Sequence, residues 1–531
     1  MSLINIKNLN LSINKQQILK NLNFEASSGE ILGVIGESGS GKSMTANSII
    51  QLLPNGSSLS GEVNFNQKNL LGFSEYNMCK IRGKDIGFVF QEPMTALNPL
   101  KNIGNQVAEV IKIHSQISFG ESLDRAAKIL ERVGLPQSKF PLSRYPFELS
   151  GGQRQRVVIA MAIAIKPKLV IADEPSTALD VTTQSKLITL LKNLVIEDNI
   201  CLIMITHDLS VIAEMANNII IMKDGEIIEK GKINILNRGL KKKYSKELLL
   251  ASNYKPKDLK KSSSSKILLN VDNITREYQD NSFKLFGKKN FFKAVKNVSF
   301  TINYNENVGL VGESGCGKST ITRAILGLDP ISTGKIFLEN DQIEVGKVSN
   351  NIRKKIQVVF QDPFGSFNPR HNVFKLISEP LYLQNSKYHF EERLDIVTSL
   401  LERVGLNKND YQKYIHEFSG GQRQRIAIAR SLILKPKLII LDEAVSALDV
   451  SIRAQILDLL VELSESFGLS YLFISHDLSL VKSITSRVLV MQSGEIVETG
   501  KTIDIFNNPS HQYTKTLIES SPNLEKSLRK L

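Results

Sequence analysis

Hydrophobic and polar residues alternate at two places in the chain, over residues 3–13 and again over residues 267–278. Alternation with a period of two is typical of strands that bury one face. Uninterrupted apolar runs follow at residues 31–35 and 308–311, and such runs indicate strands that are buried on both faces. The chain therefore repeats one order of elements, in which a half-buried strand precedes a fully buried strand.

Helical spacing of apolar residues predicts a helix directly after a glycine-rich loop in both copies, at residues 43–52 and 319–328. The same spacing predicts a helical insertion further along each copy, at residues 122–133 and 390–404. Buried strands that alternate with helices indicate an α/β fold with a parallel sheet.

Five sequence blocks recur in the same order at an almost constant separation: the glycine loop, a Gln loop, Ser-Gly-Gly-Gln, Asp-Glu after a buried strand, and a His at a strand end. This repeat predicts two homologous domains, 1–251 and 267–531. The Ser- and Lys-rich segment 252–266 is predicted to be a flexible linker. We expect the basic and aromatic segment 284–293 to be a solvated insertion in the second copy.

The composition argues against several classes of protein. The net charge of +14 comes from lysines spread along the chain, and tryptophan is absent, which disfavours a nucleic-acid-binding role. The three cysteines have no paired spacing, which favours a reducing compartment over disulfides, zinc or an iron–sulfur centre. The longest apolar run, residues 157–165, is far shorter than the about 20 residues that span a bilayer. The N-terminus lacks the apolar region of a signal peptide.

Both glycine loops have the pattern of phosphate-binding loops, and we call them the first and second phosphate loops. Backbone N–H groups of such a loop converge on phosphate oxygens, and the following helix adds its positive N-terminal dipole. We expect the lysine of each loop to reach the β- and γ-phosphates and the last serine to ligate Mg²⁺. The loop residues are Gly36, Glu37, Ser38, Gly39, Ser40, Gly41, Lys42 and Ser43 in the first copy, and Gly312, Glu313, Ser314, Gly315, Cys316, Gly317, Lys318 and Ser319 in the second.

An Asp-Glu pair ends two further apolar strands, at Asp173 and Glu174 and at Asp442 and Glu443. The carboxyl ends of parallel strands are the places where α/β proteins bind ligands. We expect the aspartates to hold Mg²⁺, mostly through water, and the glutamates to polarise the attacking water. Taken alone, either pair could be two acids in a solvated turn.

Ser150 and Ser419 each precede Gly-Gly-Gln and an apolar helix, which indicates an ordinary helix start or a second anion-binding helix N-terminus. Because each domain already has a phosphate loop, we expect these serines to serve the nucleotide of the other domain. Gln91 and Gln361 are expected to sense the γ-phosphate and to move the helical insertion. Two strand-end histidines are expected to contact phosphate, although a single His in this position is usually a core residue: His207 and His476.

The order of these blocks resembles that of the ATP-binding subunits of ABC transporters, and the resemblance covers nearly the whole chain twice. Residues 91–99, 361–369 and 509–514 are similar to the oligopeptide, dipeptide and nickel importer branch. The fused layout resembles the single-chain ATPases of microcin C-type peptide importers. The implied fold is a tandem pair of P-loop NTPase (ABC-type) domains, each with a RecA-like core, an antiparallel β subdomain and an α-helical subdomain.

The resemblance implies two ATP molecules between the halves, at composite sites. Site one would join the first phosphate loop to Ser419, Gly420, Gly421 and Gln422, and site two would join the second loop to Ser150, Gly151, Gly152 and Gln153. The implied catalytic residues are Glu174, Glu443, His207 and His476. The implied metal ligands are Ser43, Gln91, Asp173, Ser319, Gln361 and Asp442. Two further residues match the loop that couples the sites, Asp180 and Asp449.

Two positions differ between the copies. Tyr278 matches the aromatic residue on which the family stacks adenine, whereas the first copy has Ile13, so we expect weaker adenine binding at site one. Cys316 lies in a phosphate loop at a helix N-terminus, a place that lowers the pKa of a thiol. We therefore expect alkylating reagents to inhibit site two.

Together these features predict the ATP-hydrolysing, energy-coupling subunit of an importer for short peptides, with ATP and Mg²⁺ as cofactors. The partners would be two transmembrane permease subunits and, through them, a solute-binding protein. One fused chain would serve each transporter, at the cytoplasmic face of the bacterial inner membrane. A nickel or glutathione importer subunit would differ only in cargo. A soluble tandem ATPase acting on ribosomes or DNA is the alternative from another class.

Overall fold

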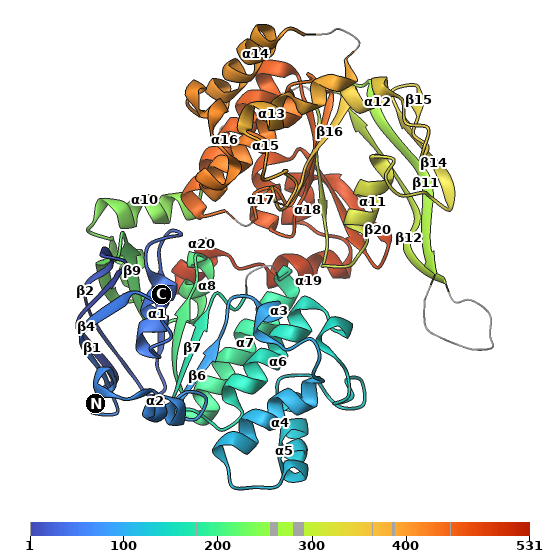
Figure 1. Cartoon of the computed structure of the whole chain (residues 1–531). Helices are drawn as coiled ribbons and strands as arrows, with labels where there is room; N and C mark the ends of the chain where they lie inside the picture. The colour runs from blue at the N-terminus through green and yellow to red at the C-terminus, as the bar shows by residue number, and fades with distance from the viewer. Residues whose placement is uncertain are drawn as a thin grey trace.

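The structure, a computed structural model, describes residues 2–176, 179–254, 264–279, 291–363, 365–384, 388–446 and 448–530. Three parts of the sequence predictions lie outside these residues: linker residues 255–263, segment residues 284–290 and Phe364. Two halves with the same layers make up the molecule, the first drawn blue to green and the second yellow to red in Figure 1.

A mixed sheet forms the centre of the first half. Its strands, in spatial order, are β10 (Glu226–Lys232), β9 (Asn218–Lys223), β3 (Ile31–Ile35), β8 (Cys201–Ile205), β7 (Leu169–Asp173) and β6 (Ile86–Val89). All neighbours are parallel except β9 and β10. Every residue of β3, β7 and β8 is buried, which explains their nearly continuous apolar sequences and confirms the predicted α/β core.

An antiparallel sheet lies beside this core and confirms the expected β subdomain. Its strands, in order, are β2 (Gln16–Ser27), β1 (Ser2–Ile13), β4 (Ser57–Phe65) and β5 (Lys68–Asn69). The alternating apolar residues of β1, such as Ile4 and Ile6, share one hydrophobic core with Leu32 and Val34 of β3 and with the helix that follows the phosphate loop. The antiparallel sheet therefore holds that loop from one side.

Helices surround both sheets of the first half. They are α1 (Lys42–Ile49), α2 (Glu75–Ile81), α3 (Pro93–Ala96), α4 (Ile103–His114), α5 (Phe119–Arg132), α6 (Gly151–Ile163), α7 (Val181–Asp198), α8 (Leu209–Met215), α9 (Ile235–Arg238) and α10 (Lys243–Ser252). The insertion predicted at residues 122–133 falls on α5, which packs on α4, and Ser118 begins α5 with a capping box. Helix α1 ends earlier than predicted because Gln51 adopts a left-handed conformation, with φ of 54°.

The second half repeats this arrangement. Its mixed sheet runs β20 (Glu495–Lys501), β19 (Arg487–Gln492), β13 (Asn307–Val311), β18 (Ser470–Ile474), β17 (Leu438–Asp442) and β16 (Ile356–Val359). Its antiparallel sheet runs β12 (Phe291–Asn303), β11 (Ile267–Gln279), β14 (Thr333–Leu338) and β15 (Asp341–Gln342). Its helices are α11 (Lys318–Ile325), α12 (Asn350–Lys355), α13 (Val373–Ser378), α14 (Phe390–Arg403), α15 (Gly420–Leu432), α16 (Val450–Phe467), α17 (Leu478–Ile484), α18 (Thr502–Asn507), α19 (Gln512–Ser520) and α20 (Leu524–Lys530).

The halves contact each other through the last helices of each half. Helix α10 packs on α16, helix α19 packs on α7, and α20 packs on α8 of the first half (Figure 1). Leu524 of α20 is buried in the core of the first half, and the Asn237 side chain donates a hydrogen bond to the carbonyl oxygen of Leu528 at 2.8 Å. Among the described residues, no helix is both long enough and apolar enough to cross a membrane.

Candidate functional site

Each phosphate loop connects a buried strand to a helix, β3 to α1 in the first half and β13 to α11 in the second. The helices begin after Gly41 and Gly317, whose φ angles are 97° and 114°. A side chain would be strained in this left-handed region, and a Cβ at Gly41 would lie 2.6 Å from Leu19. Glycine is therefore required at the turn that points the loop N–H groups inward.

The lysine of each loop is buried and folds back over its loop. Lys42 Nζ donates to the carbonyl oxygens of Gly36 and Glu37 at 2.8 and 2.9 Å. Lys318 makes the same two bonds within the second loop, at 2.7 and 2.8 Å. Burial lowers the pKa of Lys42, and the nearby carboxylates, Glu174 first among them, oppose this shift.

The aspartates at the ends of β7 and β17 lie beside the loops. Burial raises the pKa of Asp173, while a hydrogen bond with Ser43 opposes the shift. Oδ1 of Asp173 is buried and has no hydrogen-bond partner among the described residues. Burial and then the charge of Glu443 raise the pKa of Asp442 to about 6. A buried carboxylate oxygen without a donor, next to a serine hydroxyl, suits a hard cation such as Mg²⁺.

The structure brings the predicted glutamate and histidine together in both halves. His207 Nδ1 lies 3.3 Å from Glu174 Oε1, and His476 Nδ1 lies 3.2 Å from Glu443 Oε1. Gln91 donates to the other oxygen of Glu174 at 3.0 Å. Both glutamates have positive φ angles, 46° and 51°, a left-handed conformation that is uncommon for a residue with a side chain. Although burial raises the pKa of Glu443, its hydrogen bond with His476 lowers the value overall.

The two Ser-Gly-Gly-Gln segments begin helices α6 and α15. Each serine hydroxyl accepts a bond from the backbone of the glutamine three residues later, at 3.4 Å, and forms a capping box. Ser150 and Ser419 are exposed. In the described part of the chain, neither serine hydrogen-bonds to a phosphate loop, so the cap is the interaction that the structure supplies.

Contacts from the start of α16 reach the first phosphate loop instead. Asp449 accepts a hydrogen bond from the backbone N–H of Ser38 at 2.8 Å, and the Ser451 hydroxyl donates to the carboxylate of Glu37. Asp449 also contributes to the electrostatic environment of Lys42. Residues of the second half therefore complete the surroundings of the first loop.

The start of α7 makes the reciprocal contact with the second loop. The Thr182 hydroxyl donates to the carboxylate of Glu313 at 2.6 Å, and Asp180 caps the same helix through the backbone N–H of Thr183 at 2.9 Å. The cross-arrangement of the two halves is thus present at both loops, through Asp449 and Ser451 at the first loop and through Thr182 at the second.

Two family models match this chain. The family model "ABC transporter" matches residues 19–177 and 295–446, and the model "Oligopeptide/dipeptide transporter, C-terminal region" matches residues 497–531. This chain belongs to the ABC transporter family. ATP-binding proteins of this family are ATPases, so the chain binds and hydrolyses ATP. The family resemblance and the fold expected from the sequence are both confirmed.

Relatives match this ABC transporter ATPase over nearly its full length. The peptidoglycan transport ATP-binding protein YejF of Agrobacterium fabrum is 41% identical over 95% of this chain and 93% of the relative. The glutathione import ATP-binding protein GsiA of Escherichia coli K12 is 40% identical over 98% of this chain and 90% of the relative. A solved dimeric bacterial ABC transporter cassette, MJ0796, is 34% identical and covers 43% of this chain and 98% of its own, with a TM-score of 0.39.

In this ABC ATPase, the two residues that were predicted to make adenine binding differ between the sites, Tyr278 and Ile13, lie in different environments. The Tyr278 hydroxyl donates to Asp329 at 3.1 Å, and the Arg276 guanidinium lies 4.4 Å from the centre of the Tyr278 ring. Ile13 packs against the hydrophobic core of the first half. The weaker adenine binding expected at site one stays a prediction.

The lowered pKa predicted for the Cys316 thiol is wrong, whereas inhibition of site two by alkylating reagents stays a prediction. The residue is 6% exposed, and this burial raises the pKa of its thiol. The charge of Lys318 lowers the pKa, but by less than burial raises it. Burial removes the water that would stabilise a thiolate, and this desolvation outweighs the nearby Lys318 ammonium group, whose Nζ lies 3.8 Å from the thiol sulfur.

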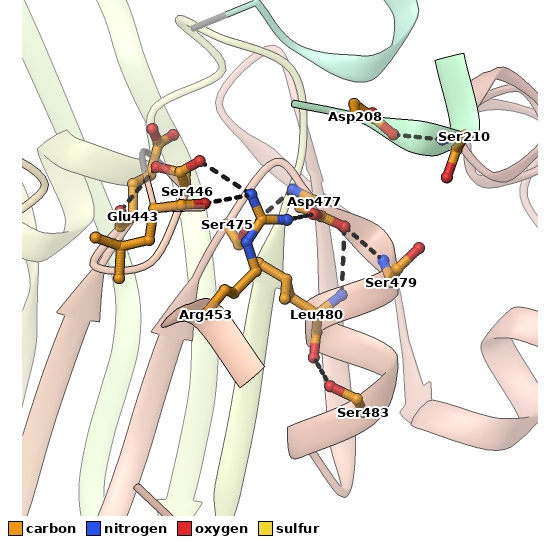
Figure 2. Close-up of polar contacts among 11 residues, drawn as sticks. Asp208, Ser210, Glu443, Ser446, Arg453, Ser475, Asp477, Ser479, Leu480 and Ser483 are labelled. Carbon is orange, nitrogen blue, oxygen red and sulfur yellow. Dashed lines mark hydrogen bonds and ion pairs between the residues drawn. The ribbon is translucent and has the colours of Figure 1, made fainter. Parts of the chain in front are cut away.

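One residue that the sequence motifs did not single out distinguishes the two halves. Figure 2 shows Arg453 of α16, which donates to the Asp477 carboxylate and to the carbonyl oxygen of Leu448, both at 3.1 Å, and to that of Ser446 at 3.3 Å. The first half has Gln184 at the matching position. Aligning the two copies residue by residue would have revealed this difference.

Proposed function

We propose that this ABC ATPase is the energy-coupling subunit of an importer for short peptides. The observation that carries the proposal is the oligopeptide/dipeptide transporter C-terminal region at residues 497–531, in a chain that already contains two ATPase halves. Glutathione, itself a short peptide, is a second candidate cargo because a relative of 40% identity is a glutathione import ATP-binding protein. The proposed domains are 1–251 and 267–531, joined by 252–266.

Each phosphate loop is proposed to bind the phosphates of one ATP. Lys42 and Lys318 would exchange their bonds to loop carbonyls for bonds to the β- and γ-phosphates. Supporting this role, each ammonium group is buried at the inner side of its loop, where it meets no competing bulk water. Ser43 with Asp173, and Ser319 with Asp442, would hold Mg²⁺ together with Gln91 and Gln361. When bound, Mg²⁺ neutralises charge that develops on the phosphates.

Glu174 and Glu443 are proposed to orient and polarise the attacking water. A carboxylate must be ionised and held still to do this; a histidine lies beside each glutamate, and for Glu443 the bond with His476 lowers the pKa. In the first half Gln91 also holds the carboxylate, so movement of the Gln loop would change the position of the base. This link offers a physical route from the γ-phosphate to the rest of the transporter.

The Ser-Gly-Gly-Gln helix of each half is proposed to face the γ-phosphate of the other half when ATP draws the halves together. The reciprocal contacts at Glu37 and Glu313 support this composite arrangement. Hydrolysis would detach the γ-phosphate that both halves contact, and departure of the phosphate would release the halves. The free energy of ATP would thus become a mechanical movement.

The proposed partners are two transmembrane permease subunits and, through them, a solute-binding protein, at the cytoplasmic face of the inner membrane. A cavity of about 900 Å³ between the second Gln loop, residues 379–383 and helix α15 would receive one permease subunit. It is lined in part by Phe360, Gln361, Tyr382 and Arg430, which offer apolar and cationic groups to an inserted helix. Exposed Met94 and Leu100 lie near the matching loop of the first half.

Vesicles holding the ATPase with its membrane subunits test the proposal. Uptake of labelled short peptide and labelled glutathione is measured beside the ATP hydrolysis rate. Met94→Asp should abolish uptake while leaving hydrolysis, and Tyr76→Ala, which removes an exposed aromatic ring on α2, should leave both unchanged. Normal uptake by the Met94 variant would refute the coupling assignment. If the unmutated complex took up neither labelled short peptide nor labelled glutathione, the peptide assignment would be refuted.

A further inference from the structure

A tyrosine from the last part of each half contacts the phosphate loop of that half. Tyr244 Oη accepts a hydrogen bond from the backbone N–H of Glu37 at 3.3 Å, and Tyr513 Oη accepts one from Glu313 at 3.0 Å. Both rings stand in the first turn of a helix, α10 or α19. The same contact therefore occurs twice, from residues far apart in sequence from the loops.

A carboxylate anchors the start of each tyrosine-bearing helix. Glu229 of β10 accepts backbone bonds from Lys241 at 2.8 Å and Lys242 at 3.4 Å. Glu498 of β20 accepts from the backbone of Ser510 at 2.7 Å and of the next residue at 3.2 Å. Burial raises the pKa of Glu498, but these bonds and two side-chain bonds outweigh it and lower the pKa to about 2. These hydrogen bonds fix the start of each helix and therefore the position of its tyrosine.

The same helices pack on the other half. Helix α10 packs on α16, where the Tyr254 hydroxyl also donates to Asp458, and α19 packs on α7. Helix α16 begins with Ser451, which contacts the Glu37 side chain, and α7 begins with Thr182, which contacts Glu313. Each loop glutamate is therefore held through its backbone by its own half and through its carboxylate by the other half.

We propose that Tyr244 and Tyr513 are positioning residues that set each phosphate loop against the helix of the opposite half. The hydroxyl fixes the backbone of the second loop residue, and this fixes where the glutamate carboxylate meets α16 or α7. The inference rests on the proposed nucleotide sites. It adds to them a third structural contributor, the helix that carries the tyrosine, α10 in the first half and α19 in the second.

Tyr→Phe substitutions test the role because they keep the ring and remove only the hydroxyl. Tyr244→Phe and Tyr513→Phe in the full chain should each raise the KM for ATP by about two- to tenfold, the range expected for one neutral hydrogen bond. The value of kcat should change less than KM. Tyr304→Phe is the matched control, because its hydroxyl donates to Glu339 beside the antiparallel sheet. An equal effect of the control would overturn the proposal.

Double-mutant cycles separate a positioning role from a general loss of stability. Tyr244→Phe should be non-additive in KM with Ser451→Ala, since both act on Glu37, and additive with Thr182→Val, which acts on the other loop. The reverse pattern is expected for Tyr513→Phe. Additivity in all four pairs would overturn the proposal.

The variant Lys42→Ala separates failure of the tyrosine proposal from failure of the phosphate-loop assignment. Its readout is the number of ATP molecules bound. Loss of ATP binding at one of two sites in that variant supports the phosphate-loop assignment. If binding is lost but all cycles are additive, only the tyrosine proposal fails. If both ATP molecules still bind, the site assignment fails and the tyrosine proposal fails with it. Thermal unfolding of every variant confirms that the measured protein is folded.

Discussion

Arg453→Gln should weaken site one more than site two. In the second half, the Arg453 guanidinium joins the start of α16 to Asp477 and to the carbonyl oxygens of Ser446 and Leu448 (Figure 2). The substitution installs the residue type found at the matching position of the first half. Because Asp449, in the same turn, bonds to the first phosphate loop, loosening this turn is expected to act on site one.

The size of the effect follows from the bonds lost. The Arg453 and Asp477 side chains are 17% and 28% exposed, so solvent screens their ion pair to about 1 kcal/mol or less. A glutamine could keep one of the two carbonyl bonds, so one more bond is lost, at about 1 kcal/mol. The total of about 2 kcal/mol corresponds to a factor of roughly 30, which is an upper limit because the turn keeps its other contacts. We expect a loss of roughly 5- to 30-fold in turnover at site one.

Single-site turnover measures this loss. In a Glu443→Gln background the remaining hydrolysis reports site one, and in a Glu174→Gln background it reports site two. Arg453→Gln should slow the first background and change the second less than twofold. Gln184→Ala is the matched control, because among the described residues its side chain makes a single bond, to Ser176 at 3.4 Å. Equal losses in both backgrounds, or a loss that tracks a fall in Tm, would refute the reasoning.

Three further predictions concern the proposed site residues. Glu174→Gln alone should slow hydrolysis at site one by roughly 10²–10⁴, measured by nucleotide trapping, and a smaller change would argue against a general base. Tyr278→Ala should weaken ATP binding at site two several-fold, and Ile13→Tyr should tighten it at site one, because ring stacking contributes about 1 kcal/mol. Titration calorimetry measures both affinities, and no change in either would contradict the prediction. Because the pKa of Asp442 rises from 3.8 to about 6 on folding, the neutral form favours the folded state. This stabilisation is complete below pH 3.8 and is lost as pH rises through about 6, so Tm should fall over that range. Asp442→Asn should remove the part of the fall that Asp442 causes. Identical profiles of Tm against pH for the variant and the unmutated protein would refute this prediction.

Local patterns in the sequence were enough to predict the elements that carry the site. The alternation in β1 and β11, the apolar runs of β3 and β13, and the glycine loops all act over a few neighbouring residues, where side-chain period and backbone freedom decide the structure. The sequence singled out Glu174 and His207 separately, and the structure brings them together because adjacent parallel strands have their carboxyl ends at the same edge of the sheet. The early end of α1 was missed because a single residue, Gln51, left the helical region.

Tertiary structure decided which distant groups share a site. Burial of Cys316 reversed the pKa shift expected at a helix N-terminus, because desolvation depends on what packs over the loop. Contacts of Glu37 with Tyr244 and Ser451 join three segments that lie far apart in the sequence and meet where α10 packs on α16. The sequence by itself determined the chemistry available in each half, since motifs are local. The meeting of the two halves depends on helix packing and charge placement across their interface, which only the folded chain defines.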